Sequence, residues 1–139
     1  MRAIFWLLIA MLLVLVACAT QPGLSTPIKL PVAGGSYTNV TPAQLKQMLA
    51  AKDFVFINVH IPYAGEIEMT DAFIPYDEIP QNISKFPADK NTKIFLYCQS
   101  GRMSAIAAEE LVKLGYTNLW NLDGGMSAWE RAGLPVIRK

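Results

Sequence analysis

The chain has 139 residues, which is enough for one domain rather than two. Its composition is that of an apolar-rich globular protein, with 53% hydrophobic residues, and part of this excess lies at the N-terminus. The formal net charge is +1, and it becomes zero if residues 1–17, which include Arg2, are removed. The sequence also shows no cluster of lysine or arginine, so long-range attraction to nucleic acid is excluded.

Residues 1–17 are predicted to be a signal peptide. Arg2 precedes an uninterrupted apolar run over 3–19, which is shorter than the ~20 residues that a membrane-spanning helix needs. The end of this run, LVAC at 15–18, resembles a bacterial lipobox. The resemblance implies cleavage before Cys18 and lipid attachment to it, which would anchor the protein to a membrane of the cell envelope on the extracytoplasmic side. An uncleaved signal anchor and simple secretion are the alternatives.

The next segment is predicted to be a flexible linker. The segment 18–35 begins with the cysteine that is expected to carry the lipid. Its residues 19–35 hold three prolines, three glycines and no hydrophobic period. We therefore expect the folded domain to occupy residues 36–139.

Strand and helix patterns alternate within this domain. SYTNV at 36–40 predicts a short strand, and Thr41 is the expected N-cap of a helix that starts at Pro42. The apolar runs FVFINV at 54–59 and KIFLY at 93–97 predict strands that are covered on both faces. The other expected elements are a short strand and a broken helix within 72–86, a helix over 104–114, a strand at 118–122 and a short helix that ends at Gly133. This alternation predicts an α/β fold with a small parallel sheet that is flanked by helices on both faces.

A cysteine, Cys98, stands directly after the second of these buried strands. Ligands of parallel sheets bind outside the carboxyl ends of the strands. Backbone N–H groups of residues 99–103 can wrap around the sulfur, because Gly101 permits unusual backbone angles and the positive end of the helix dipole lies behind them. Such a nest stabilises an anion, here a thiolate or a persulfide. A reactive thiol is therefore predicted, and an inert buried cysteine is the alternative.

The chain resembles a rhodanese domain over about residues 36–136. The resemblance rests on the loop CQSGRM at 98–103, on GYTNLWNLDGGMSAWERAGLPV at 115–136 and on the order of the elements. It implies a sulfurtransferase, in which a small donor such as thiosulfate or a persulfide loads sulfane sulfur on Cys98. A thiol, cyanide or a protein acceptor then removes the sulfur, and neither a metal nor an organic cofactor is needed. The residues expected to surround the persulfide are Gln99, Ser100, Gly101, Arg102 and Met103.

Several positions depart from the pattern of that family. Gln99 stands where thiosulfate-type members often carry a basic residue, and Met103 stands where many single-domain members have arginine or threonine. Asn58 and His60 occupy the places of the aspartate and arginine in the family's D-V-R, and we treat them as candidate auxiliary residues. A cysteine phosphatase is disfavoured, because the arginine that would clamp the phosphate is replaced by Ser104.

Other polar and glycine features are predicted to be structural. Ser104 is expected to cap a helix, and residues 123–125 form a turn whose glycines allow close backbone approach. No histidine or cysteine stands at a spacing typical of metal ligands, so no metal site is expected. Two alternatives to the enzyme stay open: a membrane-tethered, non-catalytic domain that binds a partner or senses sulfur species, and a redox sensor in which peroxide oxidises Cys98.

Overall fold

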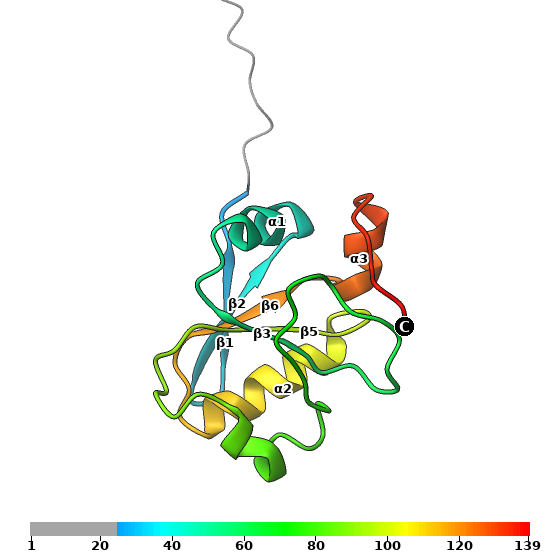
Figure 1. Ribbon diagram of the computed structural model, residues 1–139. Coiled ribbons are helices and arrows are strands. Elements are labelled where there is room, and N and C mark those ends of the chain that lie inside the picture. Colours follow the sequence, from blue (N-terminus) through cyan, green and yellow to red (C-terminus); the bar gives the residue numbers. More distant parts are fainter. Residues whose placement is uncertain (1–24) are drawn as a thin grey trace, which may run out of the picture.

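The computed structural model describes residues 25–139, so the predicted signal peptide and Cys18 lie outside the described residues (Figure 1). One six-stranded sheet has the strand order β1-β2-β6-β5-β3-β4. Its strands are β1 (Ile28–Val32), β2 (Gly35–Val40), β3 (Val55–Asn58), β4 (Ala72–Phe73), β5 (Ile94–Tyr97) and β6 (Leu119–Leu122). The helices are α1 (Pro42–Ala50), the 3-10 helix η1 (Pro80–Lys85), α2 (Arg102–Lys113) and α3 (Gly125–Arg131). Neighbouring strands are parallel except β1 and β2, so the predicted α/β fold is confirmed, and the sheet is mostly rather than entirely parallel.

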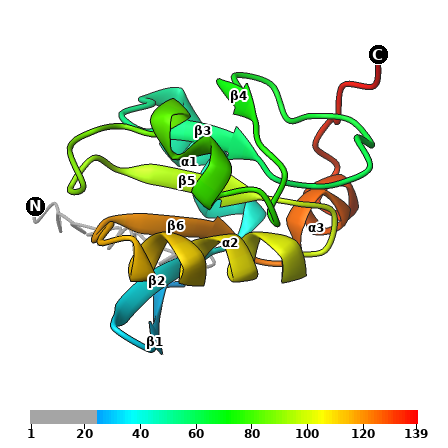
Figure 2. The same cartoon turned by 90° about the horizontal axis from the view of Figure 1, so that it is seen from below.

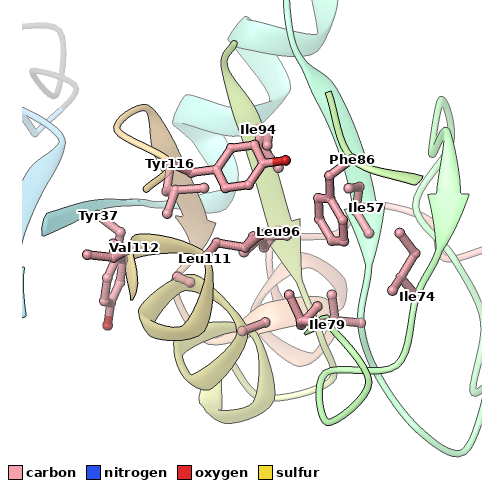
Figure 3. Packing of buried hydrophobic residues seen from close by; sticks show 14 of the residues in the cluster. Tyr37, Ile57, Ile74, Ile79, Phe86, Ile94, Leu96, Leu111, Val112 and Tyr116 are labelled. Atoms are coloured by element: carbon pink, nitrogen blue, oxygen red, sulfur yellow. The ribbon is translucent and has the colours of Figure 1, made fainter. Parts of the chain in front are cut away.

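Each face of the sheet carries its own hydrophobic cluster. Along β5, Ile94 and Leu96 pack toward α2 and η1, whereas Phe95 and Tyr97 pack toward α1 and α3. Figure 2 shows α2 running along one face of the sheet, and Figure 3 shows the cluster beneath it. Because successive residues of a strand point to opposite faces, a strand that is covered on both faces must be apolar throughout, which explains the run KIFLY.

The first helix starts where its sequence predicts. The Thr41 hydroxyl accepts a hydrogen bond from the Gln44 N–H at 3.3 Å, and the Gln44 side chain accepts one from the Thr41 N–H at 2.7 Å. This capping box satisfies two backbone donors, and Pro42 at the first helical position has no N–H that would need a partner.

The prediction of a linker over 18–35 is wrong for residues 28–35, which form β1, the turn at 33–34 and the first residue of β2. Leu30 and Val32 pack against the cluster on the α2 face, while the intervening Pro31 is exposed on an edge strand, where proline is tolerated. Gly34 takes a φ of +88° in the turn. The prolines and glycines that indicated a linker are therefore parts of a β-hairpin, and the described fold includes residues before Ser36.

A chain that starts at Ser36 should consequently be less stable than one that starts at Ser25. We expect the free energy of unfolding to fall by about 2–4 kcal/mol, because the burial of two aliphatic side chains and the pairing with β2 are lost. Urea denaturation followed by circular dichroism measures the difference. Ile28→Ser is the control, because this side chain is 61% exposed and its replacement should change the midpoint of urea denaturation little. Equal midpoints for the two chain lengths would contradict a structural role of β1.

Over residues 25–139, no helix has the length and apolar character needed to cross a membrane.

Candidate active site

The sulfur of Cys98 lies at the carboxyl edge of the sheet, directly after the central strand β5. The side chain is 1% exposed and belongs to the cluster on the α2 face. The Gly101 N–H donates a hydrogen bond to Cys98 Sγ at 3.1 Å, and the Ser104 hydroxyl donates at 3.4 Å. The sulfur is therefore enclosed by the protein and in contact with two donors, as an anionic sulfur requires.

Ser104 was predicted only as a helix cap, yet it contacts the sulfur from a fully buried position in the first turn of α2. Its hydroxyl oxygen also lies 3.2 Å from the Gly101 carbonyl oxygen. Since a hydroxyl has one proton, Ser104 can donate to the carbonyl or to the sulfur, but not fully to both. A negative charge on Cys98 favours donation to the sulfur, because a charged acceptor binds the proton more strongly than a neutral carbonyl.

The turn between Cys98 and α2 is tighter than predicted. Gly101 is the N-cap residue with a φ of +91°, and α2 begins at Arg102 instead of Ser104. The N–H groups of Arg102, Met103 and Ser104 thus belong to the first turn, where a helix offers them no carbonyl acceptor. The positive end of the helix dipole consequently lies next to the sulfur.

The turn at 123–125, which contains two glycines, and the start of α3 hold the cysteine loop in place. The Met126 N–H donates to the Cys98 carbonyl oxygen, and the Ser127 N–H donates to the Gln99 carbonyl oxygen, both at 2.9 Å. The Gln99 side-chain amide also donates to Ser127 Oγ at 2.9 Å. A Cβ atom on Gly125 would lie 2.3 Å from the Cys98 carbonyl oxygen, so this backbone approach requires glycine. The turn at 123–125 is structural, as predicted, because its close packing fixes the position of the cysteine loop.

The five residues expected around the persulfide lie on one continuous bend from the end of β5 into α2. Ser100 and Arg102 are exposed, while Gln99 and Met103 are half-buried. Gln99 directs its side chain to α3, so its contribution near the sulfur comes from the backbone. Ser127, which binds Gln99 through both main chain and side chain, was missed by the sequence analysis. Only its position beside the paired glycines could have indicated it.

The two candidate auxiliary residues lie at the carboxyl end of β3, the neighbour of β5, where Asn58 is the last residue of the strand and His60 follows it. The Asn58 amide accepts a hydrogen bond from the His60 N–H at 3.0 Å and donates one to the Gly65 carbonyl oxygen at 2.9 Å. Asn58 therefore holds the loop at 60–65. His60 lies at the same edge of the sheet as Cys98, because the Val59 N–H pairs with the Tyr97 carbonyl oxygen at 2.9 Å. Burial lowers the pKa of His60, whose Nδ1 is buried and finds no hydrogen-bond partner among residues 25–139.

This histidine should make the stability of the domain depend on pH. As pH falls below about 6.5, the unfolded chain binds a proton at His60 more readily than the folded protein, in which burial lowers the pKa of His60, so the free energy of unfolding should decrease. Denaturant titrations at about pH 7.5 and about pH 5.5 measure this decrease. His60 is the single histidine of the chain, and His60→Gln should show a smaller decrease. Equal decreases in both proteins would show that His60 has the same pKa in the folded and unfolded states.

Within residues 25–139, no group of three or more histidine, cysteine, aspartate or glutamate side chains could hold a metal ion.

The chain is similar to known proteins both in sequence and in structure. The chain matches the family described as the rhodanese-like domain over residues 41–132. It is 36% identical over 98 residues to a protein named sulfurtransferase from Allochromatium vinosum, with 67% of this chain and 88% of that protein covered. It is 33% identical over 112 residues to the uncharacterized protein slr1261 of Synechocystis, with 77% of this chain covered, and it spans 61% of that relative's length. The structure of a rhodanese-related protein from Thermoplasma volcanium is similar with a TM-score of 0.62 at 27% identity, covering 73% of this chain and 98% of that one.

Proposed function

Because the chain belongs to the rhodanese-like domain family, we propose that it is a sulfurtransferase that carries sulfane sulfur as a persulfide on Cys98. The observation that carries this proposal is the 3.1 Å contact of the Gly101 N–H with Cys98 Sγ, at the start of α2. A backbone donor and a helix N-terminus stabilise negative charge, and both the attacking thiolate and the persulfide are anions. The similarity to a protein named sulfurtransferase supports the same class of reaction.

The proposed reaction has two steps that balance without an added oxidant or reductant. In the loading step with thiosulfate, the Cys98 thiolate forms a bond to the outer sulfur atom. The bond between the two sulfur atoms of thiosulfate breaks, and sulfite leaves with the electron pair. In the release step, an acceptor attacks the outer sulfur of the persulfide, and the Cys98 thiolate leaves. Cyanide gives thiocyanate, whereas a thiol or a protein acceptor gives a new persulfide.

Arg102 is the candidate for binding an anionic donor. It carries the single charge between Cys98 and Ser104, and its exposed side chain stands at the first position of α2. A guanidinium group can donate two parallel hydrogen bonds to the oxygen atoms of thiosulfate, while the neutral donors of Gly101 and Ser104 hold the sulfur. This division of roles places the cation at the surface and the neutral donors at the reacting atom.

We also propose that Cys18 is lipidated and holds the protein on the extracytoplasmic side of a membrane of the cell envelope. The support is the sequence LVAC after Arg2 and a long apolar run. Firm anchoring needs two or more acyl chains, because a single chain gives only reversible binding.

Intact mass spectrometry of residues 25–139 tests the sulfurtransferase proposal. The reduced protein is incubated with thiosulfate or with glutathione persulfide, and we expect a gain of the mass of one sulfur atom. Addition of cyanide should reverse the gain and produce thiocyanate. If neither donor adds sulfur, the proposed activity is wrong, and the alternative of a non-catalytic binding domain is favoured.

Ser104→Ala should slow sulfur loading without preventing it. The variant loses one hydrogen bond to a charged sulfur, worth about 1–2 kcal/mol, which corresponds to a rate about 5- to 30-fold lower. Single-turnover loading, followed by quenching and mass spectrometry, measures the rate. Ser84→Ala, which removes an exposed hydroxyl in η1, is the matched control and should load at the original rate. An unchanged rate in Ser104→Ala would exclude a role of this hydroxyl.

A further inference from the structure

The antiparallel strand β1 determines where the N-terminal segment leaves the domain. Ile28 pairs with Asn39 near the end of β2, and Val40 pairs with Leu122 at the end of β6. Since β2, β6 and β5 are parallel, their carboxyl ends lie at one edge of the sheet. Cys98 follows β5 at this edge, which we call the catalytic edge. The chain that enters β1 therefore comes from the catalytic edge.

The turn at 123–124 lies near both this entry point and the cysteine loop. Ser25, Thr41 and Asp123 line a small cavity of about 30 Å³, and the Gln44 side-chain amide donates a hydrogen bond to the Ser25 carbonyl oxygen. Asp123 is followed by Gly124, whose nitrogen would lie 3.2 Å from a Cβ atom on Gly101. The turn at 123–124 thus lines a cavity together with the N-terminal segment and lies close to Gly101 of the cysteine loop.

The segment between Cys18 and Ser25 is short. Seven residue steps separate the two positions, and even a fully extended chain spans at most about 25 Å over this distance. The chain is not free as far as residue 35, as a linker would be, because residues 28–32 are held in β1. The hairpin turn at Ala33, at the far end of β1, lies at the edge opposite to the catalytic one.

We propose that the catalytic edge faces the surface of the bilayer to which the protein is anchored, so that Cys98 exchanges sulfur with partners held at that surface. This inference rests on the proposed lipidation of Cys18. A tether of this length that enters the domain at the carboxyl end of β2 keeps this edge nearer to the bilayer than the opposite edge. The exposed side chains Arg102 and Asp123 carry opposite charges, so a zwitterionic surface is sufficient.

Energy transfer from a labelled protein to labelled lipid headgroups tests the orientation. The mature lipidated chain is reconstituted in phosphatidylcholine vesicles with a small fraction of acceptor-labelled lipid. In a Cys98→Ser background, Ser100→Cys places the donor fluorophore at the catalytic edge, and Ala33→Cys places it at the opposite edge; both positions are exposed. The thiol of lipidated Cys18 is blocked, so that only the introduced cysteine reacts with the fluorophore.

We expect transfer from position 100 to be at least about twofold more efficient than from position 33, because the five residues of β1 separate the two edges by about 17 Å. Inserting a long Gly/Ser segment after Gly23 should remove the difference. Equal efficiencies, or a higher value from position 33, on vesicles that carry the protein would overturn the orientation and leave lipidation intact. If the mass of the mature N-terminus shows no lipid on Cys18, the proposed anchoring and this inference both fail, whereas sulfur loading is unaffected.

Discussion

A Gly125→Ala variant should lose most of its stability and its organised cysteine loop. The added Cβ would lie 2.3 Å from the Cys98 carbonyl oxygen and 2.7 Å from both the carbonyl carbon and the carbonyl oxygen of Gln99, and all three are backbone atoms that cannot move aside cheaply. The residue also has a φ of +58°, which is unfavourable for alanine. We expect the free energy of unfolding to decrease by about 3–5 kcal/mol, at the upper end of what single substitutions cause.

Gly133→Ala is the matched control for this substitution. Gly133 has a φ of +78°, but no atom of residues 25–139 lies within 4 Å of its added Cβ, so the conformational cost of about 1–2 kcal/mol remains without the collision. Thermal and urea unfolding of both variants separate the two contributions. If Gly125→Ala is no less stable than Gly133→Ala, the close packing of the 123–125 turn against the cysteine loop is not what requires glycine.

Local sequence signals predicted the central part of the fold well. The continuous apolar runs of β3 and β5 could only be strands buried on both faces, and Thr41 with Pro42 marked the start of α1. The strand β1 was missed because it buries only Leu30 and Val32, and because Pro31 and Gly34 are common in linkers. An edge strand needs few apolar side chains, so its signal is weaker than that of a central strand.

The sequence predicted the cysteine and the bend that follows it, but not the residues that hold them in place. The position of Cys98 after a buried strand indicated the carboxyl edge, and Gly101 indicated a bend. The contact of Ser104 with the sulfur depends on α2 beginning two residues earlier than its apolar pattern suggests. The bonds from Met126 to Cys98 and from Ser127 to Gln99 join segments that are far apart in sequence. Such pairings follow from the packing of α3 against the sheet, which no local pattern specifies.

Cys98→Ala should abolish sulfur loading, with a rate at least about a thousandfold lower than that of the original protein, because the nucleophile that the Gly101 N–H and the Ser104 hydroxyl contact is lost. Cys98 is the single cysteine from residue 25 onward, so another thiol cannot substitute in this chain. The fold should tolerate the change, since the loss of one buried sulfur atom destabilises by about 1 kcal/mol. Single-turnover mass spectrometry with thiosulfate and glutathione persulfide measures loading, and urea unfolding confirms that the variant is folded.

Cys98→Ser then separates the enzyme from its two alternatives. Serine keeps the size of the side chain and can still accept from Gly101 and Ser104, but its hydroxyl is a far weaker nucleophile than a thiolate. A sulfurtransferase loses turnover in this variant, whereas a non-catalytic binding domain shows no turnover even before the substitution. A redox sensor would instead gain oxygen from peroxide at Cys98 faster than it gains sulfur from a persulfide. Sulfur loading in Cys98→Ala would be the contrary result, since it would place the persulfide on a residue other than Cys98.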